Sequence, residues 1–310
     1  MAITAKAVSE LREKTGVGMM ECKKALTEAN GDFDEAVKLL RERGLAVAAK
    51  KASRIAAEGI VDILYCEKCK TAAMIEVNAE TDFVAKNESF QEFVKGCLEV
   101  ILKEKPSDIE DLMTKPYSDG FTVDNMLKEK ILQIGEKISI RRFVTVEGML
   151  STYIHNKGTI GVIVSVDADD KIAADSGFEE VKKNIALQVA SMNPTYICRD
   201  EVPASAIEEE REIITSQVKN DPDNEKKPAN VLEKMIEGKV GKFYETYCLL
   251  DQDYVKEDKM TVGKYIESYA KSVGGTFTVS AIHRFEKGEG IQKREENYAE
   301  EIAKLTGGGQ

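Results

Sequence analysis

"TAAMIEVN" (Thr71–Asn78), "AETDFVAKNE" (Ala79–Glu88) and "SFQEFVKGCLEV" (Ser89–Val100) form the continuous stretch that decides the fold of this chain. The first apolar run predicts a buried strand, and the last predicts an amphipathic helix. The short joint between them carries Phe83 directly after the carboxylate of Asp82. Two interpretations stay open: the ring folds back under its own hairpin, or it is presented outward as a wedge.

A second copy of this pattern predicts two related lobes. "EGIVDILY" begins at Glu58 and "EGMLSTYI" begins at Glu147, and each precedes a polar turn, an apolar run and a helix. Two such hairpin-plus-helix units favour duplication into α+β lobes over coincidence. We therefore expect Glu58 and Gly59 to correspond to Glu147 and Gly148.

The remaining segments are predicted to be mainly helical. Three short helices open the chain, with Thr4 as the N-cap of the first and Gly44 as the end of the third. A change to charged helices around a Pro-containing turn predicts a protruding αα-hairpin. The expected domains are a three-helix domain at 1–45, a helical linker at 46–57, a first lobe at 58–146, a second lobe at 147–290 with the hairpin at about 203–242, and a C-terminal helical module at 291–310.

Composition limits the classes of function. The 310 residues carry a net charge of -11, which disfavours direct binding to nucleic acid, because such proteins usually present a basic face to phosphates. No apolar run approaches the ~18 residues that a membrane helix needs. The N-terminal residues lack the apolar region of a signal peptide, so we expect a cytoplasmic location without membrane contact.

The chain offers little material for catalysis. It has two histidines and no phosphate-binding glycine loop, dinucleotide fingerprint or H-E-x-x-H zinc motif. We therefore expect no enzyme activity, no catalytic residue, no cofactor and no metal site.

The sequence "CEKC" places Cys66 and Cys69 at a predicted hairpin tip. A zinc site needs four ligands, and no second C-x-x-C exists. We expect a plain turn with neither zinc nor a structural disulfide, since thiols persist in a reducing compartment. A thiol oxidoreductase stays open as a rival function.

Two further features stand out. Met19 and Met20 open a helix, and adjacent residues there cannot both face one core, so at least one is expected to be exposed or to meet a partner. His155 lies in the turn "YIHNKGTIG" of the second lobe, where a lone histidine is usually just solvated.

Several motifs together resemble bacterial translation elongation factor Ts. They are "LREKTGVGMMECKKALTEANGDFDEAVKLLRERG", "AAEG", "VNAETDFVAKNESF", "GEKISIRRF" and "FEKGEGI". The similarity runs from about Ile3 to Ala303. It departs from many relatives at "CEKC" and in the length of "DQDYVKED".

The resemblance implies a ubiquitin-associated-type (UBA-like) N-terminal domain, two related lobes, a helical arm and a C-terminal helical module. It also implies guanine nucleotide exchange on elongation factor Tu, a GTPase that delivers aminoacyl-tRNA. Its residue roles carry over to the matching positions here. Thr81, Asp82, Phe83 and Val84 would dislocate the partner's Mg²⁺, while Met19, Met20, Lys23 and His155 would bind the GTPase. A homodimer through the helical hairpin stays open, because the role of this arm varies among relatives. A scaffold that binds without causing exchange also stays open.

Overall fold

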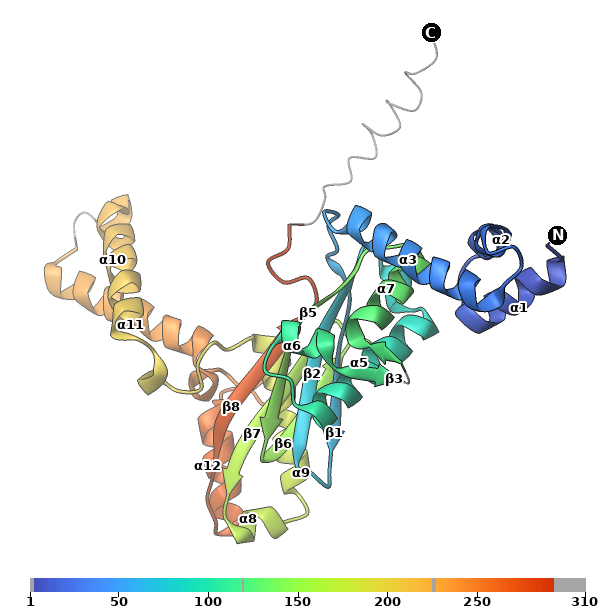
Figure 1. Ribbon diagram of the computed structural model, residues 1–310. Coiled ribbons are helices and arrows are strands. Elements are labelled where there is room, and N and C mark those ends of the chain that lie inside the picture. The colour runs from blue at the N-terminus through green and yellow to red at the C-terminus, as the bar shows by residue number, and fades with distance from the viewer. Residues whose placement is uncertain (1–2, 119, 225–226, 293–310) are drawn as a thin grey trace. The chain divides into compact units, whose positions relative to one another are not determined.

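The chain folds as an α+β protein, as the sequence predicts (Figure 1). The computed structural model describes residues 3–118, 120–224 and 227–292. The helices are α1 (Ala5–Thr15), α2 (Met19–Glu28), α3 (Phe33–Lys51), α4 (Asp82–Ala85), α5 (Glu88–Glu104), α6 (Ile109–Thr114), α7 (Val123–Ile134), α8 (Asp170–Ala174), α9 (Phe178–Met192), α10 (Ala204–Asn220), α11 (Ala229–Tyr247) and α12 (Val262–Val273). The strands are β1 (Glu58–Cys66), β2 (Thr71–Ala79), β3 (Pro116–Ser118), β4 (Phe121–Thr122), β5 (Ile138–Glu147), β6 (Met149–His155), β7 (Ile160–Ala168) and β8 (Phe277–Glu286).

Two compact units make up the chain. The first contains Met1–Val61, Ile75–Phe143 and Glu286–Gln310, and the second contains Asp62–Met74 and Val144–Phe285. The domain boundaries expected from the sequence stay a prediction. The C-terminal module expected at 291–310 lies, from residue 293 onward, outside the described residues.

Helices α1–α3 enclose a small apolar core of their own. Thr4 caps α1 as predicted, because its hydroxyl oxygen accepts a hydrogen bond from the backbone N–H of Ala7 at 3.2 Å. Arg43 on α3 forms ion pairs with Glu21 at 3.3 Å and Glu28 at 2.6 Å, both on α2. These contacts fix the orientation of α2, and with it the face that α2 presents to solvent.

The predicted helix end at Gly44 is wrong, because α3 continues through Gly44 to Lys51. Gly44 is buried, and a Cβ atom there would lie 3.4 Å from the carbonyl oxygen of Lys128 and 3.8 Å from Leu132, both on α7. The missing side chain lets α3 and α7 approach closely. Tertiary packing here outweighs the ~1 kcal/mol by which glycine disfavours a helix interior.

Two three-stranded sheets have the orders β1-β2-β5 and β6-β7-β8. Strands β6 and β7 are antiparallel, and their register runs from Met149↔Val166 to His155↔Ile160. Glu58 opens β1, whereas Glu147 ends β5 and Gly148 directly precedes β6. Gly59 and Gly148 share positive φ angles of 118° and 125°, a conformation that favours glycine. Superposition of the two lobes stays a prediction.

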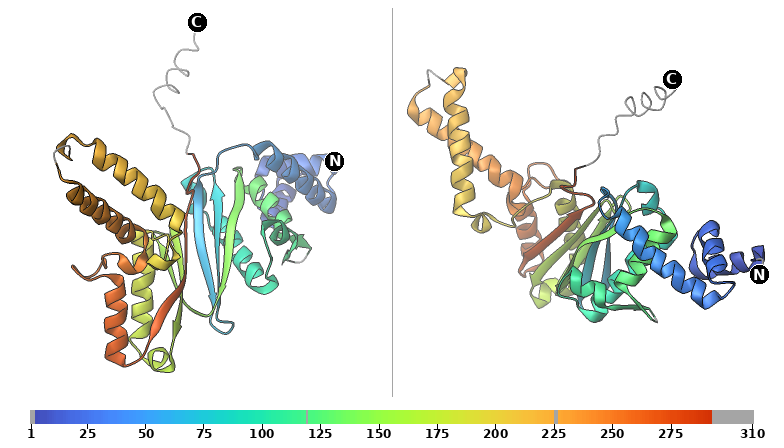
Figure 2. Two further views of the ribbon diagram at one scale, coloured as in Figure 1. Left: turned by 90° about the vertical axis from the view of Figure 1, so that its left-hand side faces the viewer. Right: turned by 45° about the horizontal axis from the view of Figure 1, so that its top comes forward.

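In the second unit, α9 packs on β6 and β7. Phe178 of α9 stacks against Tyr269 of α12 and meets Phe277 of β8 edge-on, with ring centroids 6.2 and 5.1 Å apart. The helical hairpin of α10 and α11 projects from this unit (Figure 2). Its buried residues Ile214, Val218 and Val240 pack among partly buried side chains of the same hairpin. Helix α11 extends beyond the expected end at about 242, to Tyr247.

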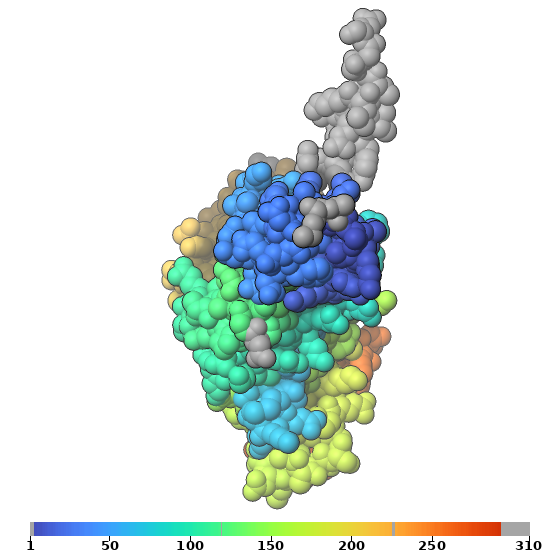
Figure 3. Space-filling model, turned by 45° about the vertical axis from the view of Figure 1, so that its right-hand side comes forward, coloured from blue at the N-terminus to red at the C-terminus, as the bar shows by residue number. Residues whose placement is uncertain are grey.

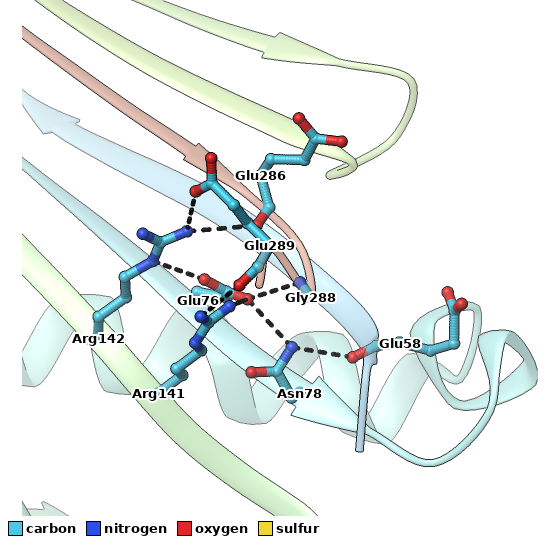
Figure 4. A network of polar contacts seen from close by, with 8 residues as sticks. All are labelled: Glu58, Glu76, Asn78, Arg141, Arg142, Glu286, Gly288 and Glu289. Carbon is cyan, nitrogen blue, oxygen red and sulfur yellow. Dashed lines mark hydrogen bonds and ion pairs between the residues drawn. The ribbon is translucent and has the colours of Figure 1, made fainter. Parts of the chain in front are cut away.

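A buried carboxylate organises the first unit (Figure 4). Glu76 on β2 is fully buried and accepts hydrogen bonds from Arg141 Nη1 at 3.0 Å and Arg142 Nε at 2.6 Å, both on β5. It also accepts from the backbone N–H of Gly288 at 2.8 Å and from Asn78 Nδ2 at 3.1 Å. The polar network therefore joins β2, β5 and the segment after β8, which are far apart in the sequence.

The absence of a disulfide at the hairpin tip was a wrong prediction. Cys66 and Cys69 are joined as a disulfide across the turn between β1 and β2. Their Cα atoms lie 5.3 Å apart, within the range that a disulfide spans. The prediction of free thiols was based on a reducing compartment. The geometry of the turn, which the prediction did not consider, brings the two sulfur atoms together.

Candidate functional site

The joint between β2 and α5 is a single helical turn. Thr81 is extended and precedes α4, the four-residue helix Asp82–Ala85, so the short joint expected from the sequence contains a helical turn. Asn87 then caps α5, because its side-chain oxygen accepts a hydrogen bond from the N–H of Phe90 at 3.2 Å. The outer side of this turn faces solvent, because Asp82 and Phe83 are exposed.

The start of this turn is fixed by two acidic residues. The carboxylate of Glu136 accepts hydrogen bonds from the backbone N–H of Thr81 at 2.9 Å and from its hydroxyl at 2.7 Å. Glu80 accepts from the N–H of Lys137 at 2.6 Å and from Arg54 Nη1 at 3.2 Å. Residues 80–81 and 136–137 therefore bind each other in both directions, and we call this set of contacts the clasp.

The end of the turn is fixed by burial and by one further hydrogen bond. The side chain of Val84 is 4% exposed and belongs to the core. Gln91 Nε2 on α5 donates to the carbonyl oxygen of Ala85 at 2.9 Å. Of the four predicted exchange residues, Val84 therefore acts as an internal anchor rather than as an exposed contact.

Phe83 is presented to solvent between these anchors. Its side chain is 77% exposed, the highest fraction among the large exposed apolar residues of the described chain. The ammonium group of Lys86 lies 5.5 Å from the ring centroid. The interpretation in which Phe83 folds under its own hairpin is wrong, because Val84 occupies the inward position of the turn.

Asp82 lies beside the ring and pairs with the same lysine. Its carboxylate accepts a hydrogen bond from Lys86 Nζ at 2.9 Å. This bond, together with the charge of Lys86, holds the pKa of the Asp82 carboxyl below its ordinary value. The turn thus presents a negative charge, a phenyl ring and a positive charge side by side.

A second exposed surface lies on α2. Cys22, Ala25 and Leu26 form its buried face. Met19 and Met20 are 51% and 66% exposed, so both side chains point away from the core. The sequence predicted that at least one of them would be exposed. Lys23 is also exposed, one helical turn after Met19. The three predicted partner-binding residues of α2 therefore belong to its solvent-facing side.

His155 lies at the end of β6, in the second unit, and is exposed. Its Nδ1 is 3.0 Å from the hydroxyl oxygen of Tyr153. This contact orients the ring in the turn without burying it.

Two residues that position the candidate site were not predicted from the sequence. Glu80 and Glu136 hold the Thr81 turn, yet an isolated glutamate beside a strand has no distinctive pattern. The only signal was that both occur inside quoted motifs, "VNAETDFVAKNESF" and "GEKISIRRF".

The residues that the structure describes contain no group of three or more His, Cys, Asp or Glu side chains that could hold a metal ion. None of the helices described is both long and apolar enough to cross a membrane.

A family model described as Elongation factor TS matches residues 80–289, a range that begins at Glu80 and includes Glu136 and His155. This chain belongs to the elongation factor Ts family. Elongation factor Ts of Clostridioides difficile (strain 630) is 48% identical over 304 residues, covering 97% of this chain and 98% of that protein. Elongation factor Ts of Clostridium perfringens (strain SM101 / Type A) is 44% identical over 308 residues, covering 98% and 99%. Elongation factor Ts of Clostridium botulinum (strain Eklund 17B / Type B) has the same identity and coverage.

The resemblance inferred from the sequence motifs is thereby confirmed. Elongation factor Ts proteins are translation elongation factors of protein biosynthesis. The family match extends over the anchored turn and its clasp, while the full-length relatives also cover the three N-terminal helices.

Proposed function

We propose that this chain is a guanine nucleotide exchange factor for elongation factor Tu. It binds the GDP form and promotes GDP release and GTP loading during translation elongation. Thr81, Asp82, Phe83 and Val84 form the segment that dislocates the Mg²⁺ of the partner. Asp82 and Phe83 enter the partner's site, while Thr81 and Val84 hold the segment in place.

The observation that carries this proposal is the exposure of Phe83 on a turn anchored at both ends. An isolated loop could present a ring, but it would lose conformational entropy on binding. Here the clasp of Thr81 by Glu136 and the burial of Val84 fix the backbone beforehand. The ring is therefore available as a preorganised anchor for a pocket in another protein.

Exchange by this route is a matter of linked equilibria. The exchange factor and the nucleotide share one GTPase but favour different arrangements of its Mg²⁺ and phosphate site. If the factor weakens nucleotide binding, the nucleotide must weaken binding of the factor by the same ratio. The chain then needs no catalytic residue and no cofactor, and it acts by binding rather than as an enzyme.

The exposed face of α2 supports a second contact with the GTPase domain. Met19 and Met20 supply adaptable apolar surface, and Lys23 adds a positive charge beside them. His155 is proposed as a contact from the second unit. The UBA-like nature of helices α1–α3 and a contact by the C-terminal module belong to the same proposal.

Partners and location follow from this role. Elongation factor Tu is the proposed partner, in the cytoplasm, with no direct contact to nucleic acid or membrane. A homodimer through α10 and α11 is a separate proposal, supported by the exposed side chain of Ile213 on α10. Sedimentation of the full chain would test it, and a monomer at high concentration would argue against it.

The test of the main proposal is release of labelled GDP from purified elongation factor Tu. We expect the full chain to accelerate release, and the Phe83→Ala variant to bind less well and accelerate less. A scaffold would bind the GTPase without changing release. A thiol oxidoreductase would also leave release unchanged, so the assay separates exchange from both rival functions, and binding to the GTPase then distinguishes the scaffold.

A further inference from the structure

The turn between β1 and β2 carries a chemical group that nucleotide exchange does not use. It consists of the disulfide of Cys66 and Cys69, separated by Glu67 and Lys68. Within the second unit this hairpin turn, drawn in light blue, lies at the surface (Figure 3). Cys69 is exposed and Cys66 is half-buried. The two sulfur atoms therefore differ in their access to a reagent from solution.

The two sulfur atoms also differ in their electrostatic surroundings. The backbone N–H of Cys69 donates a hydrogen bond to Cys66 Sγ at 3.2 Å. An N–H donor stabilises a thiolate more than a neutral sulfur, because it faces a full negative charge. Cys66 is therefore the better leaving group when the disulfide is attacked.

The other cysteines lack this arrangement. Cys22, Cys97 and Cys248 are buried. Burial raises the pKa of each of these thiols, to about 11 for Cys248. Cys198 is partly exposed and has no cysteine partner. Of the six cysteines, all of which the structure describes, only the pair at the hairpin tip combines access from solution with a cysteine partner.

We propose that Cys66 and Cys69 form a reversible thiol–disulfide exchange site whose reaction partners are dithiols, including proteins with a C-x-x-C motif. Disulfides in a reducing compartment are usually transient and serve exchange or sensing rather than structure. The two sulfur atoms close a loop of only four residues, which constrains the unfolded chain less than a long loop does.

The reduction proceeds in two balanced steps. A thiolate of the dithiol attacks Cys69 Sγ, the bond between Cys69 Sγ and Cys66 Sγ breaks, and the electron pair leaves on Cys66 Sγ. The second thiol of the reagent then attacks the reagent sulfur that is bonded to Cys69. This attack closes the reagent's disulfide and releases Cys69 as a thiolate. The pair gains two electrons and two protons, and the dithiol loses the same number as it becomes a disulfide.

Two contacts at the hairpin tip do not depend on the sulfur bond. Thr71 Oγ1 donates to the carbonyl oxygen of Cys69 at 3.0 Å. The backbone N–H of Gly148 donates to the carbonyl oxygen of Lys70 at 2.9 Å, within the same unit. Reduction therefore leaves two independent contacts that hold the turn, and the site can cycle without unfolding the sheet.

The first experiment measures reversibility on the folded full-length chain. Oxidised glutathione should remove two hydrogen atoms from the intact mass, and both cysteines should then resist N-ethylmaleimide. Millimolar dithiothreitol without denaturant should restore two labelled thiols, mapped by peptide mass to Cys66 and Cys69. Cys198→Ser should behave like the parent chain. Two thiols that never join, or a disulfide that only a denaturant makes reducible, would refute the site.

The second experiment tests the order of the steps. Limiting glutathione added to the oxidised chain and quenched with acid should be trapped mainly on Cys69. In single-cysteine tip variants, Cys66 in Cys69→Ser should react with iodoacetamide at neutral pH about threefold faster than Cys69 in Cys66→Ser. This factor is the net effect of a tenfold larger thiolate fraction and the accompanying loss of nucleophilicity. Exposure alone predicts the opposite order, and that result would overturn the proposal.

Discussion

Glu136 holds Thr81 at two points, since its carboxylate accepts both the backbone N–H at 2.9 Å and the hydroxyl at 2.7 Å. The neighbouring residues make the reverse contact. Glu80, which precedes Thr81, accepts a hydrogen bond from the backbone N–H of Lys137, which follows Glu136, at 2.6 Å. Arg54, which follows α3, donates to Glu80, and Lys137 Nζ donates to the carbonyl oxygen of Arg54 at 2.8 Å. The turn that presents Phe83 is therefore positioned by a closed set of polar contacts.

Glu136→Ala should reduce both nucleotide release and stability. Its loss frees the start of the turn, so Phe83 must be ordered again on binding. We expect a fall in stability of about 1–2 kcal/mol, because the contacts are partly exposed, and roughly a tenfold fall in GDP release at subsaturating factor. Urea unfolding and a release assay measure the two effects.

Thr81 provides the matched control for this clasp. Thr81→Ser keeps the hydroxyl and should release GDP like the parent chain, whereas Thr81→Val should resemble a mild form of Glu136→Ala. A folded Glu136→Ala variant with unchanged release at every concentration would contradict the positioning role.

Phe83→Ala should leave the fold intact and impair exchange. The ring is 77% exposed, so its removal creates no cavity, and the change in unfolding free energy should stay within about 0.5 kcal/mol. As an interface anchor it should be worth about 2 kcal/mol, or roughly thirtyfold in affinity for the GTPase. Melting curves and GDP release across a titration of factor measure both.

Two substitutions bracket this result. Val255→Ala removes an exposed apolar side chain from another loop and should change neither quantity. Phe90→Ala removes a fully buried ring and should cost about 3–5 kcal/mol of stability. If Phe83→Ala melts like Phe90→Ala and stimulates normally per folded molecule, the wedge interpretation is wrong.

Local signals predicted several elements well. The predicted buried strand Thr71–Asn78 lies within β2, and Thr4 caps α1 as expected. These features depend on residues within one turn of each other, where capping and periodicity are decisive. Exposure of Phe83 was one of two open interpretations, and the buried neighbour Val84 decided between them.

Contacts between distant segments could not be predicted in the same way. Gly44 looks like a helix stop, and only its approach to Lys128 explains why α3 continues. Glu76 and Arg142 are ordinary strand residues in the sequence, and no periodicity pairs them. The clasp of Thr81 by Glu136 likewise depends on how the loop after α7 returns to the end of β2.

Replacement of Glu76 should destabilise the chain strongly. Its buried carboxylate faces Arg141 and Arg142, whose side chains are each 30% exposed. Removal of one member of such a group leaves charges without their partner, and Glu76→Ala should therefore cost about 3 kcal/mol in urea unfolding. Glu76→Gln keeps one acceptor and should cost less. Glu67→Gln, at an exposed turn, should stay within about 0.5 kcal/mol. A loss equally small for Glu76→Ala would mean that the network contributes little.

Acid sensitivity of the fold should depend on His283 in β8. Burial lowers the pKa of its imidazole below the ordinary value, so the unfolded chain binds a proton more readily than the folded chain does. The stability that this group contributes is complete above the unfolded pKa of about 6.5 and is lost as the pH falls through the lower folded pKa. His283→Gln should therefore show a smaller drop in the urea midpoint between about pH 7.5 and about pH 5 than the parent chain.

The chain has two histidines, and His155, which is exposed, supplies the control. His155→Gln should follow the parent chain at both pH values, whereas an unchanged acid response in His283→Gln would assign the sensitivity to carboxylates instead.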